Sequence, residues 1–403
     1  MGILERALSA FGLQRKSASV QLPEGWSYSG AGAAGEIVTP HSAMGLSAVW
    51  ACSNLISGTI SSLPLQVFRT GPDGYRRVDR GHPLYPVLHD SPNFEQTALD
   101  FLDYLNLSIE LWGNGYARKI RGAGGRVVSL RPIKPDVVTV RRLASGALEY
   151  RWTEDGQAFT SGEADVLHIR GPGGDPLGGM STLTFARNSF SSAQAAELAA
   201  AGMFRNGLRP SGVITFKDWL TPEQRAIAQS SLSEKYLGAM NAGRPFIAEG
   251  GMEYTQLTLS PEDAQMLETR QFSIEEICRF FGVPPVLIGH AGASTAWPTS
   301  VEQQIIMFVQ FTLRRRLKRI EQAIQKQLFT PQERAAGLVV EFNIEGLLRG
   351  DSAARASFYG AGLQSGWLTI NEVRAKENLP AVAGGETPRM QMQNVPITEA
   401  GAE

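Results

Sequence analysis

Five positive charges lie within a six-residue segment of a chain whose net charge is close to zero. The segment is RRRLKR, residues 314–319. The whole chain has 38 Lys and Arg against 39 Asp and Glu, so its total charge points neither to nucleic acid nor to a membrane surface. Any electrostatic function must therefore come from local clusters such as this one, and such a cluster suits phosphates or acidic side chains.

The basic segment lies on one face of a helix predicted over residues 300–329. At 100° per residue, the apolar side chains near Leu313 form one continuous stripe made of Val309, Leu317, Ile320, Ile324 and Leu328. The opposite side of the same helix contains Arg314, Arg315, Lys318 and Arg319. The pattern therefore predicts a helix that is buried along one side and basic along the other.

Exposure to solvent is the ordinary interpretation of such a face, but two features favour a covered one. Met307, Phe308 and Phe311 make the start of the helix apolar almost all round, so it needs neighbours on both sides. The preceding predicted helix has an excess of acids, namely Glu262, Asp263, Glu268, Glu275 and Glu276. We expect these acids to be the counterpart of the basic face.

No arrangement of residues predicts a catalytic, metal or cofactor site. The chain lacks GxxxxGK[ST], and its glycine-rich GPGGDPLGG lacks the lysine that a phosphate-binding loop needs. The five histidines, His41, His82, His89, His168 and His290, show no zinc-ligand spacing. A Ser/His/Asp triad stays open, since residues that meet only in space are invisible in a sequence. We expect a protein that is not an enzyme.

The cysteine count and the hydropathy indicate a reducing compartment without a membrane. Cys52 and Cys278 each lie in an apolar helical pattern, which favours buried thiols over a disulfide or a metal site. No apolar run reaches the roughly 18 residues that a membrane span needs. Arg6 stands where an N-myristoylation signal requires Ser or Thr. We expect the protein in the host cytoplasm or in a particle assembled there.

The order of elements predicts an α+β fold rather than a doubly wound nucleotide fold. A helix begins after Thr39 and ends at Pro64, and β-hairpins that are neighbours in sequence then continue to about residue 180. A long Ala-rich helix, a small αβ insert and a helix capped by Ser260 follow. After the basic helix, the chain ends with one strand, two helices and a tail rich in Gly and Pro.

Ten short segments, in this order and with these element types, resemble the portal (head-to-tail connector) proteins of long-tailed bacteriophages and of related gene transfer agents. They include VWACSNLISGTISSLPLQVF, HPLYPVLHDSPN, ELWGNGYA, SLRPIKPDVVTV, DPLGGMSTL and MFRNGLRPSGVI. The series continues with LSPEDAQMLETRQFSIEEICRFFGVPPVLIG, TSVEQQ and LTINEVRAKENLPAVAGG. Each segment alone is a weak signal, but their common order over residues 40–396 is specific.

The resemblance implies a portal-type fold with an α/β wing, a two-helix stem, a small αβ clip, a long tunnel helix and a helical crown. Its parts fall on these residues: flexible N-terminal arm 1–39, wing 40–180, stem helix 181–206, clip 207–258, second stem helix 259–288, tunnel loop 289–299, tunnel helix 300–330, wing return strand 331–350, crown 351–380 and C-terminal tail 381–403. Many relatives have a Pro after the Thr-Leu of the tunnel helix, where this chain has Arg314. We therefore expect a straighter helix here.

The resemblance also implies a function and partners. A homo-oligomeric ring, typically of twelve copies, would lie at one capsid vertex of the virion and pass double-stranded DNA during packaging and ejection. The implied partners are the major capsid protein, the terminase large subunit, a neck or head-completion protein and the DNA itself. The family uses a separate ATPase, which agrees with the missing phosphate-binding loop. No cofactor, metal or membrane is implied.

The charge of such a ring decides which residues face the DNA. Twelve copies of four basic residues would give about 48 positive charges, whereas 45 Å of duplex carries only about 26 phosphates. A lumen lined in this way would hold DNA instead of letting it slide. We expect the acids of the preceding helix or of an adjacent subunit to neutralise the basic face. The lining would then be the tunnel loop, with His290, Ser294, Thr295, Trp297 and Thr299.

Two other interpretations stay open. A non-portal DNA-binding protein using the basic helix 311–328 would be a monomer or dimer with salt-sensitive DNA affinity. A cytoplasmic enzyme with an unrecognised site would have a concave pocket with perturbed titratable groups.

Overall fold

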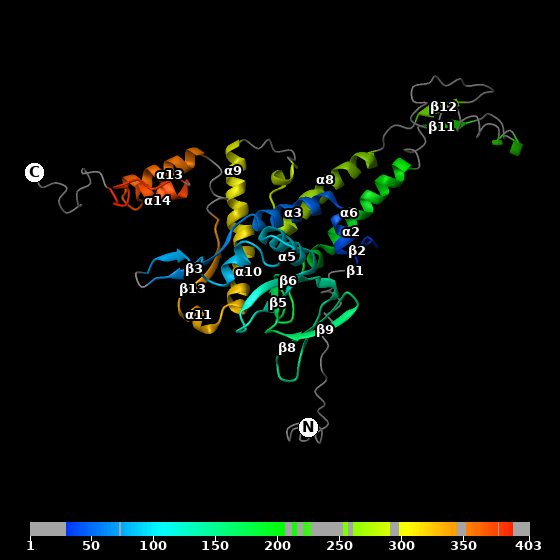
Figure 1. Ribbon diagram of the computed structural model, residues 1–403. Coiled ribbons are helices and arrows are strands. Elements are labelled where there is room, and N and C mark those ends of the chain that lie inside the picture. Colours follow the sequence, from blue (N-terminus) through cyan, green and yellow to red (C-terminus); the bar gives the residue numbers. More distant parts are fainter. Residues whose placement is uncertain are drawn as a thin grey trace, which may run out of the picture. The chain divides into compact units, whose positions relative to one another are not determined.

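The computed structural model divides into two compact units (Figure 1). The larger unit comprises Met1–Ser62 and Gln66–Glu341, and the smaller one comprises Leu63–Leu65 and Phe342–Glu403. The structure describes residues 30–71, 74–205, 212–215, 221–223, 225–226, 253–256, 261–290, 298–344, 352–377 and 379–389. Within these ranges, no helix is both long and apolar enough to cross a membrane.

The first helices of the larger unit begin and end where the local chemistry dictates. Helix α2 (Pro40–Met44) has a capping box between Thr39 and Ser42, and α3 (Ser47–Ser61) follows after Gly45. The sequence predicted one helix here, but the extended backbone at Leu46 separates two. Helix α5 (Ala98–Trp112) has a capping box at Thr97 and ends at Gly113, whose φ of 81° suits a residue without Cβ.

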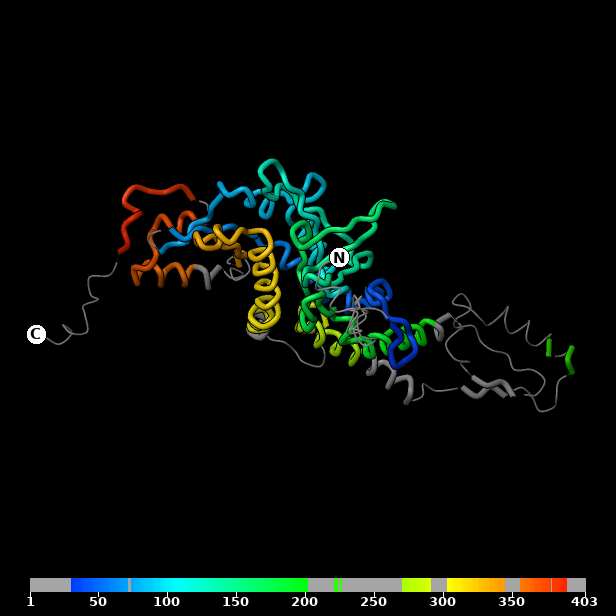
Figure 2. Tube along the Cα trace, turned by 90° about the horizontal axis from the view of Figure 1, so that it is seen from below, coloured from blue at the N-terminus to red at the C-terminus, as the bar shows by residue number. Residues whose placement is uncertain are grey.

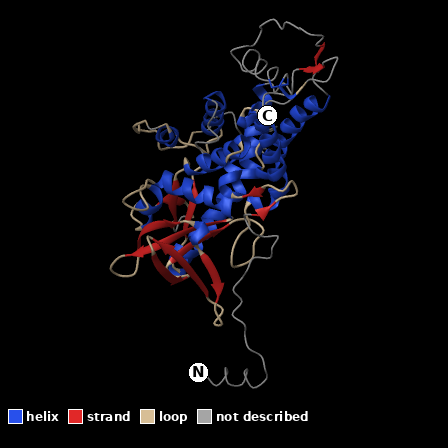
Figure 3. Cartoon of the chain, turned by 90° about the vertical axis from the view of Figure 1, so that its right-hand side faces the viewer, coloured by secondary structure: helices blue, strands red, loops and turns tan. Residues whose placement is uncertain are grey.

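Antiparallel strands form the β part of the larger unit, as the hairpin pattern predicted. One sheet has the order β10-β5-β6, with β5 Asn114–Arg121, β6 Val127–Ile133 and β10 Val166–Arg170. A second has the order β7-β8-β9, with β7 Thr139–Arg142, β8 Leu148–Glu154 and β9 Gln157–Gly162. A third has the order β13-β3-β4, with β3 Leu65–Thr70, β4 Arg76–Val78 and β13 Leu338–Phe342. Figure 3 shows the strands gathered on one side of the helices.

Strand β9 was not predicted from the sequence, although the sequence contains a signal for it. Asp155 and Gly156 form the turn between β8 and β9, and both have positive φ, 50° and 76°. Two successive positive φ values match the right-handed twist of a hairpin, and Asp-Gly is a strong sequence signal for this turn. Trp152 of β8 stacks on Phe159 of β9, with ring centroids 5.3 Å apart.

Two long helices lie side by side in the larger unit (Figures 1 and 2). They are α6 (Thr182–Arg205) and α8 (Pro261–Phe281), close to the predicted stem helices. Phe190 stacks on Phe281 between them, with centroids 6.3 Å apart. Strands β11 (Gly212–Thr215) and β12 (Glu253–Gln256) pair in the segment predicted as the clip. The helix predicted after Thr221 lies mostly outside the described residues.

The helical path after residue 298 contains an irregularity that the sequence did not predict. Helix α9 (Pro298–Met307) continues into a π-helical segment η5 (Phe308–Leu313) and then into α10 (Arg314–Leu328). The single α-helix predicted over residues 300–329 is therefore interrupted by a π-helical segment, while the straighter course expected at Arg314 stays a prediction. Two arginine side chains form hydrogen bonds with backbone carbonyl groups of this segment. Arg315 Nε donates to Phe311 O at 3.1 Å, and an Arg316 nitrogen donates to Thr312 O at 3.2 Å.

Two glutamines fix α10 between strands of different sheets. Gln325 accepts from Val340 N and donates to Leu338 O, at 2.9 and 2.7 Å. Gln327 does the same with the backbone of His168, at 2.9 and 2.8 Å. Each amide side chain thus replaces a strand partner at a sheet edge. The predicted apolar stripe of α10 is confirmed, because Leu313, Leu317, Ile320, Ile324 and Leu328 are all buried.

Shorter elements complete the described structure. A small hairpin of β1 (Gly30–Ala31) and β2 (Ile37–Val38) lies within the predicted N-terminal arm, so the arm is shorter than residues 1–39, and the rest of it lies outside the described residues. The smaller unit contains α13 (Ser352–Gln364) and α14 (Ile370–Lys376). The remaining helices are α4 (Leu84–His89), η2 (Pro135–Val137), η4 (Pro285–Ile288) and α11 (Pro331–Ala335). His89 is the last residue of α4.

We expect the Gln327→Leu variant to lose about 2–4 kcal/mol of unfolding free energy, because it leaves two backbone groups of His168 without partners. Urea unfolding checks this value. The matched control is Gln322→Leu on the exposed side of the same helix, which should change little. Equal losses in both variants would contradict the assigned role of Gln327.

Buried Lys119 makes stability depend on pH. Burial, and then the charge of Arg121, lower the pKa of Lys119 to about 8, while its Nζ donates to Glu163 O at 3.0 Å. The unfolded chain therefore binds more protons between pH 8 and 10.5, so stability should rise with pH in this window, by up to about 3 kcal/mol. Thermal unfolding of wild type and Lys119→Met checks this, and an equal rise in both would contradict it.

Candidate DNA channel and subunit interface

A buried ion pair lies where four helices of the larger unit converge. Arg316 of α10 binds both carboxylate oxygens of Glu110 on α5, at 2.6 and 3.0 Å. The same guanidinium donates to Phe281 O at the end of α8, and Thr182 at the start of α6 donates to Glu110. The two charged side chains are only 16% and 7% exposed. This pair sets the position of α10 against the other three helices.

Glu110 was not predicted as a site residue, although the sequence contains one signal for it. Glu110 is an isolated acid among the buried residues of α5, next to Ile109 and Leu111. A charge on an apolar helix face indicates a buried partner. The partner itself could not be identified, because Arg316 is 206 residues away in the chain.

On the basic face of α10, one residue forms ion pairs with carboxylates in the described part of the chain and the other three do not. Lys318 pairs with Glu321 at 2.7 Å and with Glu341 at 3.6 Å, and the hydrogen bond to Glu321 raises the pKa of Lys318. Arg314 and Arg315 are exposed, and Arg319 is half-buried. Within the described residues, no ion pair joins Arg314, Arg315 or Arg319 to a carboxylate.

The acids of α8 are not brought to this face within the part of one chain that the structure describes. Glu275 lies 3.8 Å from His290, and no ion pair of Glu276 is found among the described residues. The side chains of Glu262, Asp263 and Glu268 lie outside the described part. Neutralisation of the basic face by acids of an adjacent subunit stays a prediction.

Only part of the predicted tunnel loop lies within the described residues. His290 follows η4, and its side chain is 18% exposed. Thr299 lies in the first turn of α9, and its side chain is not described. Ser294, Thr295 and Trp297 lie outside the described residues. The loop therefore remains a prediction as the lining of a channel.

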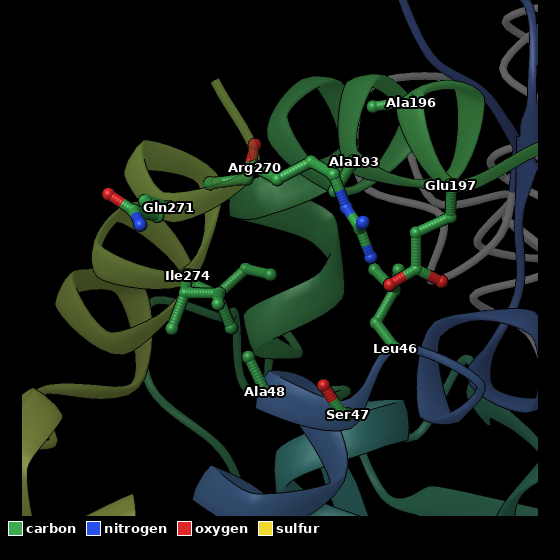
Figure 4. A pocket seen from close by; sticks show the side chains of 11 residues that line it. Leu46, Ser47, Ala48, Ala193, Ala196, Glu197, Arg270, Gln271 and Ile274 are labelled. Carbon is green, nitrogen blue, oxygen red and sulfur yellow. The ribbon is translucent and has the colours of Figure 1, made fainter. Parts of the chain in front are cut away.

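Two clefts lie on the helical part of the larger unit. One, of about 310 Å³, lies between the start of α3 and helices α6 and α8, and Figure 4 shows Glu197 and Arg270 pointing toward each other across it. The other, of about 320 Å³, lies beside the buried ion pair and contains Arg279, Arg315, Arg316 and Arg319. In the described part of the chain, no group of three His, Cys, Asp or Glu residues could hold a metal ion.

The two cysteines agree with the sequence prediction of buried thiols. Cys52 of α3 and Cys278 of α8 are both buried, with their Sγ atoms 3.9 Å apart. Hydrogen bonding between the two thiols raises the pKa of Cys52 and lowers that of Cys278. They contribute to the packing of α3 on α8.

Comparison with known proteins identifies the family. The phage portal protein family model matches residues 47–378. The portal protein of Enterobacteria phage HK97 is 37% identical over 358 residues, which is 88% of this chain and 84% of the relative. The probable portal protein of Streptomyces phage phiC31 is 34% identical over 368 residues, which is 88% of this chain and 79% of the relative. The chain belongs to the phage portal protein family.

The solved structures support the same assignment. A chain in the neck of an empty gene transfer agent particle, computed with C6 symmetry, superposes with a TM-score of 0.63 and 26% identity, covering 83% of this chain and 90% of that chain. The fold is thus the α+β portal fold, as the sequence predicted. Portal proteins are structural connectors at a capsid vertex of the virion and not enzymes, which confirms the expected connector role.

We expect Arg316→Met to lower the free energy of unfolding by about 3–5 kcal/mol, because it leaves the carboxylate of Glu110 buried without a charge partner. The double variant Glu110→Leu with Arg316→Met should regain most of that loss, since it removes both charges. Arg314→Met, at an exposed position of the same helix, is the control. Urea unfolding measures all three, and a loss in the double variant as large as in the single one would contradict this account.

Proposed function

We propose that twelve copies of the chain form a closed ring at one capsid vertex, and that double-stranded DNA passes through its centre during packaging and ejection. The observation that carries this proposal is the apolar surface around η5. Ile305, Ile306, Met307 and Phe311 are 39–61% exposed in a single chain, while Phe308 and Val309 beside them are buried. A helical segment that is apolar on both sides needs a second covering surface.

A neighbouring copy is the partner that best fits this surface. Closed rings use heterologous interfaces, in which one patch of each copy meets a different patch of the next. The apolar patch at residues 305–311 and the alanine-rich part of α6 at residues 193–201 are two such patches. The sixfold symmetry recorded for the related gene transfer agent neck supports a ring of this kind, because it is compatible with twelve copies.

The parts of the chain then take the roles that the family resemblance implies. Residues 40–180 and 331–350 form the wing, helices α6 and α8 the stem, and residues 207–258 the clip, which docks the terminase large subunit and later a neck protein. The wing is the surface proposed for the major capsid protein. The tunnel loop at residues 289–299 faces the DNA with small and polar side chains. Assembly takes place in the host cytoplasm before the ring enters the virion.

The distribution of charge in α10 supports a lumen that does not hold DNA. Arg316 and Lys318 already have carboxylate partners within one chain. Charges with partners release few counterions when a duplex passes, so they add little to DNA affinity. The remaining arginines of the basic face are proposed to meet acids of the adjacent subunit.

Native mass measurement and negative-stain microscopy test the ring. We expect annular particles of about 520 kDa for twelve chains of 43.7 kDa each. Phe311→Glu should lower the fraction of ring at least tenfold without unfolding the chain, since Phe311 is 61% exposed in one copy. Gln310→Glu, the exposed neighbour, is the matched control.

Other outcomes of this experiment would overturn the proposal. Monomers or dimers that bind duplex DNA in a salt-dependent way would indicate a DNA-binding protein that uses residues 311–328. Compact monomers without DNA affinity would favour an enzyme or another soluble protein.

A further inference from the structure

The cleft beside the buried ion pair contains more positive charge than it can neutralise. Its four guanidiniums come from Arg279, Arg315, Arg316 and Arg319, and its one carboxylate is Glu110. Both oxygens of Glu110 are engaged by Arg316. Among the described residues, no carboxylate pairs with Arg279, Arg315 or Arg319. The cleft therefore has a surplus of three positive charges.

The surplus is unfavourable because part of it is removed from water. Burial, and then the charge of Arg316, lower the pKa of Arg319. An arginine stays protonated in a protein, so the lowered pKa expresses a free-energy cost of keeping the charge there. An incoming carboxylate would offset that cost and form bidentate hydrogen bonds with a guanidinium.

The walls of the cleft add a preference for an aromatic group. Ile109, Phe185, Phe280 and Phe281 line it together with the arginines. Phe185 and Phe280 are 52% and 39% exposed, so their rings are open to a ligand. Aromatic rings pack on one another and on guanidinium planes. The cleft thus suits a segment that presents an aromatic side chain next to an acid.

One described segment of the chain has this composition. Phe94 is 92% exposed, and Glu95 next to it is also exposed. They lie in the loop between α4 and α5; Asp90 begins this loop, and Asp100 follows it in the first turn of α5. Covering an almost fully exposed phenylalanine with another apolar surface is favourable in water.

The loop around Phe94 is held rigidly. The Asn93 side chain accepts from the backbone nitrogens of Glu95 and Gln96, at 3.0 and 2.9 Å, and donates to Leu130 O at 3.0 Å. The Leu130 nitrogen donates to Pro92 O at 2.7 Å. A rigid loop that presents an aromatic residue loses little entropy on binding, which is typical of an interface anchor.

The loop cannot fill the cleft of its own chain. It precedes the start of α5, whereas Ile109 and Glu110 lie in the last turn of that helix, about 18 Å from its first residue at 1.5 Å per residue. The cleft and the loop are also different patches of one chain, as a heterologous interface requires. A second copy is therefore the occupant that the charges and the geometry favour.

We propose that Phe94 and Glu95 of one copy insert into the arginine cleft of the next copy, with the carboxylate of Glu95 between Arg315 and Arg319 and the ring of Phe94 against Phe185 and Phe280. This inference rests on the proposed ring, because it names one pair of patches that close it. The cleft is incomplete without the adjacent subunit.

Cysteine cross-linking tests the contact directly. In a chain with both Phe94→Cys and Phe185→Cys, mild oxidation of assembled rings should give a ladder of covalent multimers on a non-reducing gel, at least tenfold more than in either single variant. The matched control pairs Phe94→Cys with Phe272→Cys, a similarly exposed position on α8. Intact rings without a ladder, or equal ladders in the control, would overturn the proposal.

A charge exchange gives a second, independent test. Arg315→Glu should lower the ring fraction at least tenfold at a fixed concentration, and adding Glu95→Arg should restore it. Arg315 is exposed in a single chain, and thermal unfolding of the unassembled protein checks that the variant still folds. Rescue by Glu276→Arg instead of Glu95→Arg would assign the contact to the acids of α8 and refute the role of Glu95.

The two proposals fail in different ways. A wild-type protein that never forms rings refutes the proposed function itself. If the wild-type protein forms rings and the variants Phe94→Ala, Arg315→Glu and Arg319→Gln form them equally well, only the contact in the cleft is refuted. If these arginine variants form intact rings but bind a 30-base-pair duplex more weakly in fluorescence anisotropy, the arginines face DNA and not a neighbour.

Discussion

The buried pair of Glu110 and Arg316 is the constraint on which the arrangement of the helices depends. It joins α10 to α5 directly, and its remaining hydrogen bonds reach the start of α6 and the end of α8. A buried charge is stable only when its partner forms well-aligned hydrogen bonds with it. The pair therefore sets both the position of α10 and its rotation about its own axis. With that rotation set, the apolar stripe is buried, and Gln325 and Gln327 meet the edges of two sheets.

The same rotation decides what the single chain leaves uncovered. Placing Arg316 inward leaves Arg315 outside and Arg319 half-buried beside a cleft with one carboxylate. The π-helical segment leaves Phe308 buried and Phe311 exposed. Both features are unfavourable in an isolated chain, and in the proposed ring a neighbouring copy would cover them. The surfaces proposed to form the ring would then follow from the fold of one subunit.

Much of the fold and of the family could be predicted from the sequence. The hairpins up to residue 170 follow turn residues and alternation, the capping box at Thr97 marks the start of α5, and the stripe around Leu317 is helical. Strand β9 was missed although Asp155-Gly156 signals its turn. The candidate site was only partly predicted. The basic face is present, but the pairing of the neighbouring Arg316 with Glu110 was not foreseen, since Glu110 lies in a distant segment whose approach depends on helix packing.

The sequence by itself determined the α+β class, the order of elements and membership of the portal family, because these depend on local periodicity and on short segments in a common order. Only the tertiary structure decided which charges are neutralised within one chain and which are left over. Long-range pairing, such as that of Glu110 with Arg316, depends on how elements far apart in the chain pack. The same packing accommodates the π-helical turn at Phe308–Leu313, where Thr312 donates to the carbonyl of Gly282.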